Sequence, residues 1–450
     1  MLDRDQLGTE AALARRQKFG VTLCCGDDVA ASRTLQLAVL TAASIACRCF
    51  PGAIRTAMSA ALAEAPLLVW PQRKLSFGVA VSEILSTITV DGAGQPVSSR
   101  SLIFGNAPTA KGALRVTFDG WITKVGPAQK VPRLQEREYF SGAGVLAASL
   151  ALSELFLSFA DIDIEATRRA IGLSLWRPDL DIGDAEALGI PVEYLPSAAW
   201  VLGLGHLGNA YLWTLATLPY ADPSEVEFAL FDFDKVKEEN IETGIVFSGD
   251  FLRRFKTRAC AAWLYHRGFQ SRLVERRFDG TFRVHDKEPL LALCGFDSNP
   301  VRRNLPFAQF ARVIETGLGG MADNFDTISF HTLPNPRSAE VLWPDMTDEE
   351  KAKLAAYEER MARDNPGYVG LGGEECGRRG LAGEAVAVPF VGTTAASLVV
   401  AEAVRLLHDG PAYFDIRLSL GNLAGRFARR NGNYAAQDAA GLSFVAAKKD

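Results

Sequence analysis

Short apolar runs alternate regularly with helix-length segments from residue 196 to the end of the chain. The runs AAWVLGLG, EVEFALFDFD, SRLVERRF, PLLALCGFD and ARVIETG predict five strands, and the segments near 206–218 and 250–267 predict intervening helices. Buried parallel strands have this composition because helices cover both faces of the sheet. We therefore predict a doubly wound, Rossmann-like α/β domain over residues 196–450.

Residues 1–195 show weaker patterns and are predicted to form a second domain. An Ala-rich helical zone lies near 30–64, strand-like alternation follows around 76–90 and 113–118, and an amphipathic helix is expected near 142–160. Single hydrophobic cores usually stop growing at about 250–300 residues, so a chain of 450 residues is expected to form two domains. A stretch rich in Pro, Gly and Asp before residue 195 indicates the boundary.

Two apolar stretches approach the composition of a membrane span. Leu35–Ala46 is too short to cross a bilayer, and Val145–Ala160 contains Glu154. Both are predicted to be buried helices.

Charge and cysteine content argue against several classes of protein. The chain has 48 Lys and Arg against 53 Asp and Glu, without the run of basic residues that a nucleic-acid partner would require. Its seven cysteines are an odd number with no Cys-x-x-Cys pair, and its first residues lack the apolar core of a signal peptide. We expect reduced thiols in the cytoplasm, no structural zinc, and no membrane or nucleic-acid partner.

A glycine loop joins the first predicted strand of the second domain to the following helix. Gly203, Gly205 and Gly208 form a G-x-G-x-x-G motif, and Asp232 ends the next strand 24 residues later. Such a loop lets the backbone approach a phosphate at a helix N-terminus, and the carboxylate can accept hydrogen bonds from ribose hydroxyls. A dinucleotide dehydrogenase, an ATP-using enzyme and a ligand-free turn all have this pattern.

The residues after Asp232 separate these alternatives. The continuation D-F-D-K-V-K-E-E-N, the position of one lysine, and a D-x-x-x-x-R motif at the fourth strand resemble the ThiF/MoeB/ubiquitin-activating enzyme superfamily. The residues that carry this resemblance, beyond the glycine loop, are Asp232, Asp234, Val236, Asn240, Lys256, Asp297 and Arg302. The matched region covers roughly residues 196–450.

The resemblance implies ATP and Mg²⁺ as cofactors and assigns roles to individual residues. Gly203, Gly205 and Gly208 look like the phosphate loop, Asp232 and Asp234 look like nucleotide ligands, and Asp297 looks like the Mg²⁺ ligand. Asn240 and Lys256 match the positions that meet the phosphates. The superfamily adenylates the C-terminal glycine of a ubiquitin-like protein and releases pyrophosphate.

One departure concerns an arginine of the family pattern. Thr243-Gly244 stands where the family has Arg-Gln, so a phosphate-contacting arginine is missing. Arg253, Arg254 and Arg258 are candidate replacements, because all three are predicted to lie on the same helix as Lys256. In the family an arginine of the partner half can also reach the phosphates, and Arg16, or its neighbour Arg15, matches that element. A non-catalytic homologue remains an alternative.

Cys376 is the predicted nucleophile. It lies in the Gly-rich stretch near 365–383, and Arg378 and Arg379 follow it closely, which favours the thiolate, although Glu374 and Glu375 oppose this effect. In the ubiquitin-activating branch such a cysteine takes the acyl group as a thioester and passes it to a conjugating enzyme. The catalytic residues are therefore predicted to be Cys376, Lys256 and Asp297.

The N-terminal segment has no glycine loop. The resemblance therefore implies that residues 1–195 form an inactive adenylation-like half, so that one chain is a pseudo-dimer, with a homodimer of chains as the alternative. Lacking zinc-ribbon cysteines, the chain resembles the activating components of bacterial ubiquitin-like conjugation systems more than sulfur-carrier enzymes. A sulfur-carrier or peptide adenylating enzyme, an NAD-dependent oxidoreductase and a scaffold remain alternatives.

Overall fold

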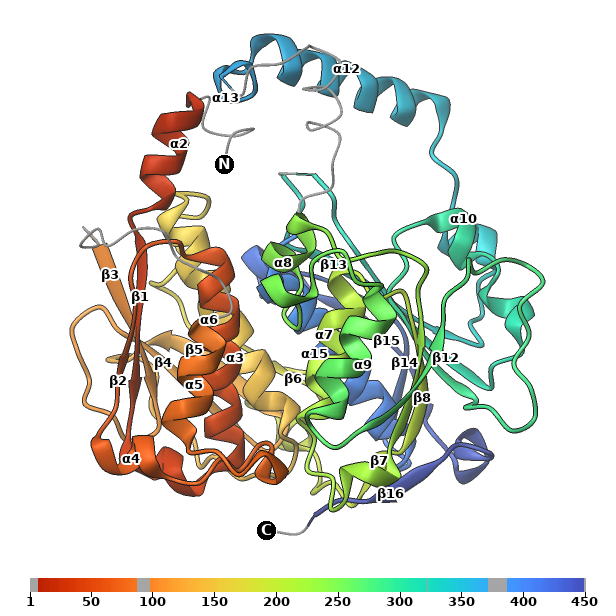
Figure 1. The fold of residues 1–450 in the computed structure, drawn as a ribbon, viewed down its shortest axis with the longest axis horizontal. Helices are drawn as coiled ribbons and strands as arrows, with labels where there is room; N and C mark the ends of the chain where they lie inside the picture. The colour runs from red at the N-terminus through yellow and green to blue at the C-terminus, as the bar shows by residue number, and fades with distance from the viewer. Residues whose placement is uncertain (1–6, 87–97, 322, 371–386, 449–450) are drawn as a thin grey trace.

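The computed structural model describes residues 7–86, 98–321, 323–370 and 387–448. Two large sheets stand side by side, and long helices fill the space between them (Figure 1). Both sheets carry helices, which confirms the predicted α/β class.

The C-terminal sheet has eight strands in the order β10-β9-β8-β11-β12-β13-β14-β15. The first five in this order are parallel, and the remaining three continue antiparallel. Their bounds are β8 Ala198–Leu202, β9 Glu227–Phe231, β10 Gln270–Val274, β11 Leu291–Cys294, β12 Arg312–Leu318, β13 Thr327–Leu333, β14 Pro411–Ser419 and β15 Phe427–Asn433. The five predicted strands correspond to β8 to β12.

The helices of this part are α7 (His206–Ala216), α8 (Glu238–Thr243), α9 (Lys256–Tyr265), α10 (Asn299–Arg302), α11 (Ala339–Leu342), α12 (Asp348–Asp364), α13 (Pro366–Val369) and α15 (Pro389–Leu406). A small antiparallel pair, β7 (Tyr194–Pro196) and β16 (Phe444–Ala446), joins the start of this part to the end of the chain.

The N-terminal sheet has six strands in the order β2-β1-β3-β4-β5-β6. The strands are β1 Phe19–Cys25, β2 Ile54–Ala57, β3 Ser98–Phe104, β4 Leu114–Asp119, β5 Ile122–Pro127 and β6 Ile171–Ser174. The helices are α2 Thr9–Arg16, α3 Arg33–Cys49, α4 Ala60–Glu64, α5 Phe77–Leu85 and α6 Gly142–Phe159.

The two sheets share one topology. In each, a strand–helix–strand unit (β1-α3-β2 and β8-α7-β9) is followed by two further parallel strands, an antiparallel strand, a long helix and a last antiparallel strand. The later elements are β3, β4, β5, α6 and β6 in one sheet and β11, β12, β13, α15 and β14 in the other. The C-terminal sheet has β10 and β15 in addition, one at each edge.

The prediction of a strand around residues 76–90 was wrong for Phe77–Leu85, which form α5. Its apolar residues also recur at helical spacing, and the helix buries Phe77, Ala80, Val81 and Ile84. Ser76 caps the helix by accepting a hydrogen bond from the Val79 amide.

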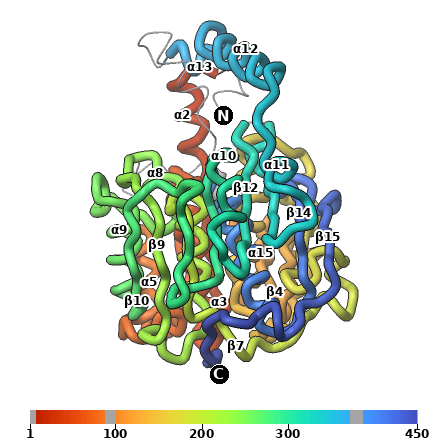
Figure 2. Tube along the Cα trace, turned by 90° about the vertical axis from the view of Figure 1, so that its right-hand side faces the viewer, coloured from red at the N-terminus to blue at the C-terminus, as the bar shows by residue number. Residues whose placement is uncertain are grey.

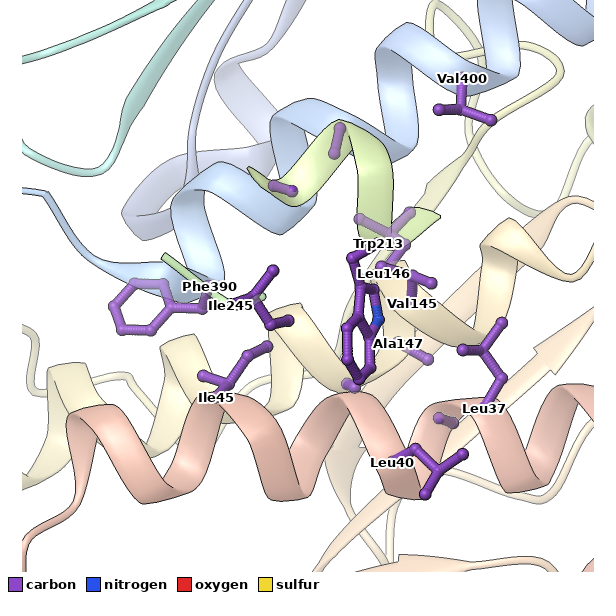
Figure 3. Packing of buried hydrophobic residues seen from close by; sticks show 14 of the residues in the cluster. Leu37, Leu40, Ile45, Val145, Leu146, Ala147, Trp213, Ile245, Phe390 and Val400 are labelled. Atoms are coloured by element: carbon purple, nitrogen blue, oxygen red, sulfur yellow. The ribbon is translucent and has the colours of Figure 1, made fainter. Parts of the chain in front are cut away.

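Four long helices form the core between the sheets. Helices α3 and α6 of the N-terminal part pack against α7 and α15 of the C-terminal part, with Leu40, Leu146, Trp213 and Val400 among the residues at their contacts (Figure 3). Helices α6 and α15 are long and apolar enough to cross a membrane, but both are buried here in the interior. The second predicted apolar helix is thus confirmed as α6, and Leu35–Ala46 lies within the wholly buried α3.

Helices α12 and α13 stand away from the rest of the molecule. They form an arch that leaves the C-terminal part beyond α11 and reaches α2 of the N-terminal part (Figures 1 and 2). Thr347 and Glu350 form a capping box at the start of α12. At the far end of the arch, the Thr9 hydroxyl donates a hydrogen bond of 2.7 Å to the Gly367 carbonyl.

Candidate active site

The glycine loop connects β8 to α7, and its glycines serve different purposes. Gly203 has φ of +79°, and a Cβ on Gly208 would lie 1.9 Å from the Gly203 carbonyl oxygen, so the turn itself requires both. A Cβ on Gly205 would meet nothing within 4 Å. Gly205 therefore leaves open space directly before the first turn of α7, where backbone N–H groups can receive an anion.

Asp232 follows β9 and holds this loop in place. Its Oδ2 accepts a hydrogen bond of 2.7 Å from the Leu204 amide, and its Oδ1 accepts one of 2.8 Å from the Asp234 amide. The carboxylate is buried, and burial raises its pKa, while the charge of Lys256 acts in the opposite direction.

Lys256 is the first residue of α9 and lies next to the end of β9. Its Nζ is 3.4 Å from Asp234 Oδ2, and its amide donates to the Asp234 carbonyl at 2.9 Å. The residue is buried although its ammonium stands at the positive end of a helix. The structure thus brings Asp232, Asp234 and Lys256 together beside the glycine loop.

Asp297 reaches the same edge of the sheet from β11. Cys294 pairs with Leu202 of β8, and Phe296 packs beside the loop, 3.0 Å from where a Cβ on Gly203 would lie. Asp297 is exposed, and its carboxylate makes no hydrogen bond or ion pair with any residue in the described ranges.

Arg302 fixes the segment that carries Asp297. Its Nε donates to the Phe296 carbonyl at 2.8 Å and forms an ion pair of 3.1 Å with Glu315 Oε1 on β12. His331 of β13 contacts the other oxygen of Glu315 at 3.0 Å. Glu315 and His331 were missed by the sequence analysis because their relation to Asp297 is created by strand pairing and has no local signal.

Asn240 lies on the short helix α8. Its Oδ1 accepts a hydrogen bond of 3.0 Å from the Lys237 amide and so caps the helix. The C-terminal residue of α8, Thr243, accepts a hydrogen bond at its carbonyl from Nδ1 of His206, with 2.7 Å between the atoms. His206 is the first of the two residues between the second and third glycines, so a hydrogen bond joins the loop directly to α8.

The candidate replacements for the missing family arginine differ in their surroundings. Arg258 forms two hydrogen bonds with Glu275, at 2.8 and 2.9 Å, which neutralise its charge. The prediction that Arg253 and Arg254 share a helix with Lys256 was wrong, because α9 begins only at Lys256. Arg254 lies over the Phe251 ring, and Arg253 is exposed with φ of +67°.

Arg16 of the N-terminal part lies beside the C-terminal end of α8. Together with Thr243 it lines a cavity of about 380 Å³ between the two parts. Its one hydrogen bond with the described residues is 3.3 Å long, to the Arg48 carbonyl, whereas Arg15 pairs with Asp161. The cavity is lined by Thr9, Ala12, Leu13, Arg16, Arg48, Cys49, Phe156, Glu242, Thr243, Ala387, Val388 and Pro389.

Arg48 at the end of α3 is a further residue that the sequence analysis missed. Its guanidinium donates to the carbonyls of Ile241, Gly244 and Phe247 at 2.8 to 3.2 Å. The arginine of the N-terminal part therefore supports the segment where the family pattern places its own arginine, and it does so by binding backbone.

Cys376 lies outside the described residues. The other six cysteines are half-buried or buried. Burial raises the pKa of Cys25, Cys49 and Cys294 to about 12 and also raises that of Cys260. These four are protonated thiols at neutral pH and are poor nucleophiles.

Two family models and one relative, all of the same family, match the two parts of the chain. Residues 20–175 match the family model "BilD N-terminal domain", and residues 195–410 match "BilD C-terminal domain". The bacterial E1-like protein BilD of Collimonas sp. (strain OK412) is 33% identical over 414 residues, which cover 90% of this chain and 86% of that protein.

Two solved structures that resemble the chain have lower sequence identity to it than this relative has. E. coli MccB is 13% identical with a TM-score of 0.36, over 68% of this chain and 73% of that one. E. coli tRNA N6-threonylcarbamoyladenosine dehydratase, TcdA, in complex with ATP, is 16% identical with a TM-score of 0.30, over 47% of this chain and 86% of that one.

Proposed function

Because the chain belongs to the BilD family of bacterial E1-like proteins, we propose that it activates the C-terminus of a ubiquitin-like protein with ATP. The observation that carries the proposal is the meeting of three elements at the carboxyl ends of β8, β9 and β11. These are the open glycine loop, the Lys256–Asp234 pair and the Asp297 carboxylate, which has no partner among the residues that the structure describes. Ligands of open α/β sheets bind at this edge.

The first step brings together two anions, the substrate carboxylate and ATP, so the site needs cations and N–H donors that neutralise the phosphates. An oxygen of the substrate's C-terminal carboxylate attacks the α-phosphorus of ATP, and the bond from that phosphorus to the β-phosphate oxygen breaks. The products are the acyl adenylate and pyrophosphate. Gly205 and the first turn of α7 receive the phosphates, and Lys256 neutralises charge on the departing pyrophosphate.

The carboxylate of Asp297, which follows β11, is a suitable ligand for Mg²⁺. No group of three or more His, Cys, Asp and Glu side chains in the described part of the chain could hold a metal alone. Mg²⁺ in nucleotide sites commonly uses one or two carboxylates together with phosphate oxygens and water, and the free Asp297 carboxylate can supply such a ligand. When bound, the ion neutralises the phosphates; Asp297 holds it.

The second step transfers the acyl group to sulfur. In our proposal the thiolate of Cys376 attacks the carbonyl carbon of the adenylate, AMP leaves, and a thioester forms. A cysteine of a conjugating enzyme then takes the acyl group by exchange of one thiol for another. The low reactivity of the four buried cysteines supports Cys376 as the nucleophile.

We further propose that one chain acts as a pseudo-dimer in the cytoplasm. The repeated topology of the two sheets and the arginines that the N-terminal part directs toward α8 support this arrangement. The N-terminal part then plays the role of an inactive partner half.

ATP–pyrophosphate exchange tests the first step. The full chain is incubated with MgATP, labelled pyrophosphate and a panel of ubiquitin-like proteins, each paired with a version lacking its last glycine. We expect exchange with a glycine-ended protein, loss of exchange in Asp297→Ala, and full exchange in Asp286→Ala, which removes an exposed carboxylate elsewhere. Absence of exchange with the whole panel contradicts the proposal, as does exchange that survives Asp297→Ala.

A thiol-labile adduct on a non-reducing gel tests the second step. A sulfur-carrier or peptide adenylating enzyme gives exchange without this adduct, so the two readouts together distinguish these functions. An NAD-dependent oxidoreductase or a scaffold gives neither.

A further inference from the structure

His206 stands at a junction of three elements. It is the first residue of α7, its ring reaches Thr243 at the end of α8, and α15 packs against its other edge. A Cβ on Gly392 of α15 would lie 2.4 Å from Nε2, so only glycine allows this approach. The imidazole is therefore enclosed between the glycine loop, α8 and α15.

The hydrogen bond to Thr243 defines which ring nitrogen carries a proton. A carbonyl oxygen can only accept, so Nδ1 must be the donor. Burial lowers the pKa of His206, although the backbone groups of Thr243 and Val388 oppose this effect. The ring is consequently neutral at neutral pH, with Nδ1–H directed at α8 and a buried Nε2.

Two side chains outside α8 form hydrogen bonds with the carbonyl groups at its C-terminal end. Arg48 holds its C-terminal end from the N-terminal part, and His206 holds the same end from the glycine loop. The helix itself has six residues and none of them is buried. These two contacts, together with the packing of Ile241 on the core, set the position of Asn240 relative to the loop.

We propose that His206 is a positioning residue for nucleotide binding: its Nδ1–H bond to Thr243 fixes α8, and with it Asn240, at the correct distance from the phosphate loop. The ring also keeps the first turn of α15 against that loop. The inference rests on the proposed function in so far as the nucleotide is ATP. It assigns to His206 no contact with the substrate.

Two substitutions separate the hydrogen bond from the volume of the ring. Asparagine can place an N–H donor near the position of Nδ1 but is smaller than histidine. Leucine fills a similar volume and has no donor. If His206 acts through its hydrogen bond, His206→Asn retains MgATP binding and His206→Leu loses it. If His206 acts through packing, His206→Leu retains MgATP binding and His206→Asn loses it.

Binding of MgATP to the full-length protein, measured by isothermal titration calorimetry, tests the inference without any ubiquitin-like protein. We expect His206→Leu and His206→Ala to weaken binding by about tenfold, the effect of one lost hydrogen bond that positions a charged ligand. We expect His206→Asn to remain within about threefold of wild type by the same reasoning. His285→Ala, which changes an exposed histidine, should bind as wild type does.

Each outcome bears on a different claim. Equal affinities for all variants, or tight binding by the leucine variant with weak binding by the asparagine variant, would overturn the positioning role. If His206→Ala does not fold, the comparison of Asn with Leu still decides. Wild-type protein that fails to bind MgATP overturns both this inference and the proposed function, whereas binding without exchange contradicts only the latter.

Discussion

The Lys256 ammonium lies 3.4 Å from the Asp234 carboxylate, at the point where α9 begins beyond the end of β9. A buried cation at a helix N-terminus is unfavourable by itself, because the helix dipole has the same sign there. Asp234 offsets this charge in the protein without nucleotide. A phosphate that binds at the glycine loop can replace Asp234 as the partner of Lys256. The ion pair therefore positions the Lys256 ammonium before the nucleotide binds.

Lys256→Met is therefore expected to reduce ATP–pyrophosphate exchange by at least about 100-fold, the usual cost of removing a group that stabilises transition-state charge. The side chain keeps its length and loses its charge. Lys235→Met is the matched control, because Lys235 is exposed, directly follows Asp234 in the chain, and lies over the ring of Phe255, the residue before Lys256. A decrease of similar size in both variants would show that the effect is not specific to Lys256.

Arg16 and Arg15 form a natural pair for testing the contribution of the N-terminal part. Arg16 lines the cavity beside Thr243 and has one long hydrogen bond in the described structure, whereas Arg15 pairs with the exposed Asp161. We expect Arg16→Ala to reduce exchange by about tenfold or more, while Arg15→Ala leaves it near wild type. Thermal melting should show little change for either. Equal activity of the two variants would remove Arg16 from the proposed site.

The local patterns that predicted β8, β9, β11 and β12 were strong because these strands are mostly buried, whereas the edge strand β10 is only partly buried. The glycine loop and Asp232 follow from positions at strand ends. The interval 77–85 satisfied two periodicities at once, and the cap at Ser76 favours the helix α5.

Residues that act across the sheets had no such local signal. Arg48 lies 193 positions from Ile241, whose carbonyl it binds, and Glu315 meets Arg302 only because β12 runs beside β11. The hydrogen bond from His206 to Thr243 spans 37 positions. Such contacts depend on tertiary packing, which periodicity does not report.

Substitution of Cys376, with Cys49 as the matched control, tests which cysteine forms the thioester. Cys49 lines the cavity but is buried, and burial raises its pKa to about 12, so it should not form a thioester. We expect Cys376→Ala to keep exchange and lose the thiol-labile adduct, while Cys49→Ala keeps both. The measurement is a non-reducing gel with and without added thiol. An adduct that persists in Cys376→Ala would contradict the nucleophile assignment.

His408 joins α15 to the segment between the two parts, and its bonds require a neutral ring. Its Nε2 accepts hydrogen bonds from the amides of Glu193 and Tyr194, at 2.8 and 3.2 Å, and its Nδ1 donates to the Val404 carbonyl. Burial is the main cause that lowers its pKa below the usual value of 6.5, while Glu193 and Asp409 oppose the shift. The unfolded chain therefore binds this proton more readily than the folded one.

The lowered pKa of His408 makes the stability of the protein depend on pH. The contribution of His408 to stability is fully present above pH 6.5 and is lost as the pH falls toward its lowered pKa in the folded state. We expect the urea midpoint of wild type to fall between pH 7.5 and pH 5.5 by more than that of His408→Gln, which cannot titrate. The variant should be less stable than wild type at pH 7.5, because it lacks the imidazole bonds to the backbone. Parallel pH profiles for the two proteins would show that His408 does not titrate in this range.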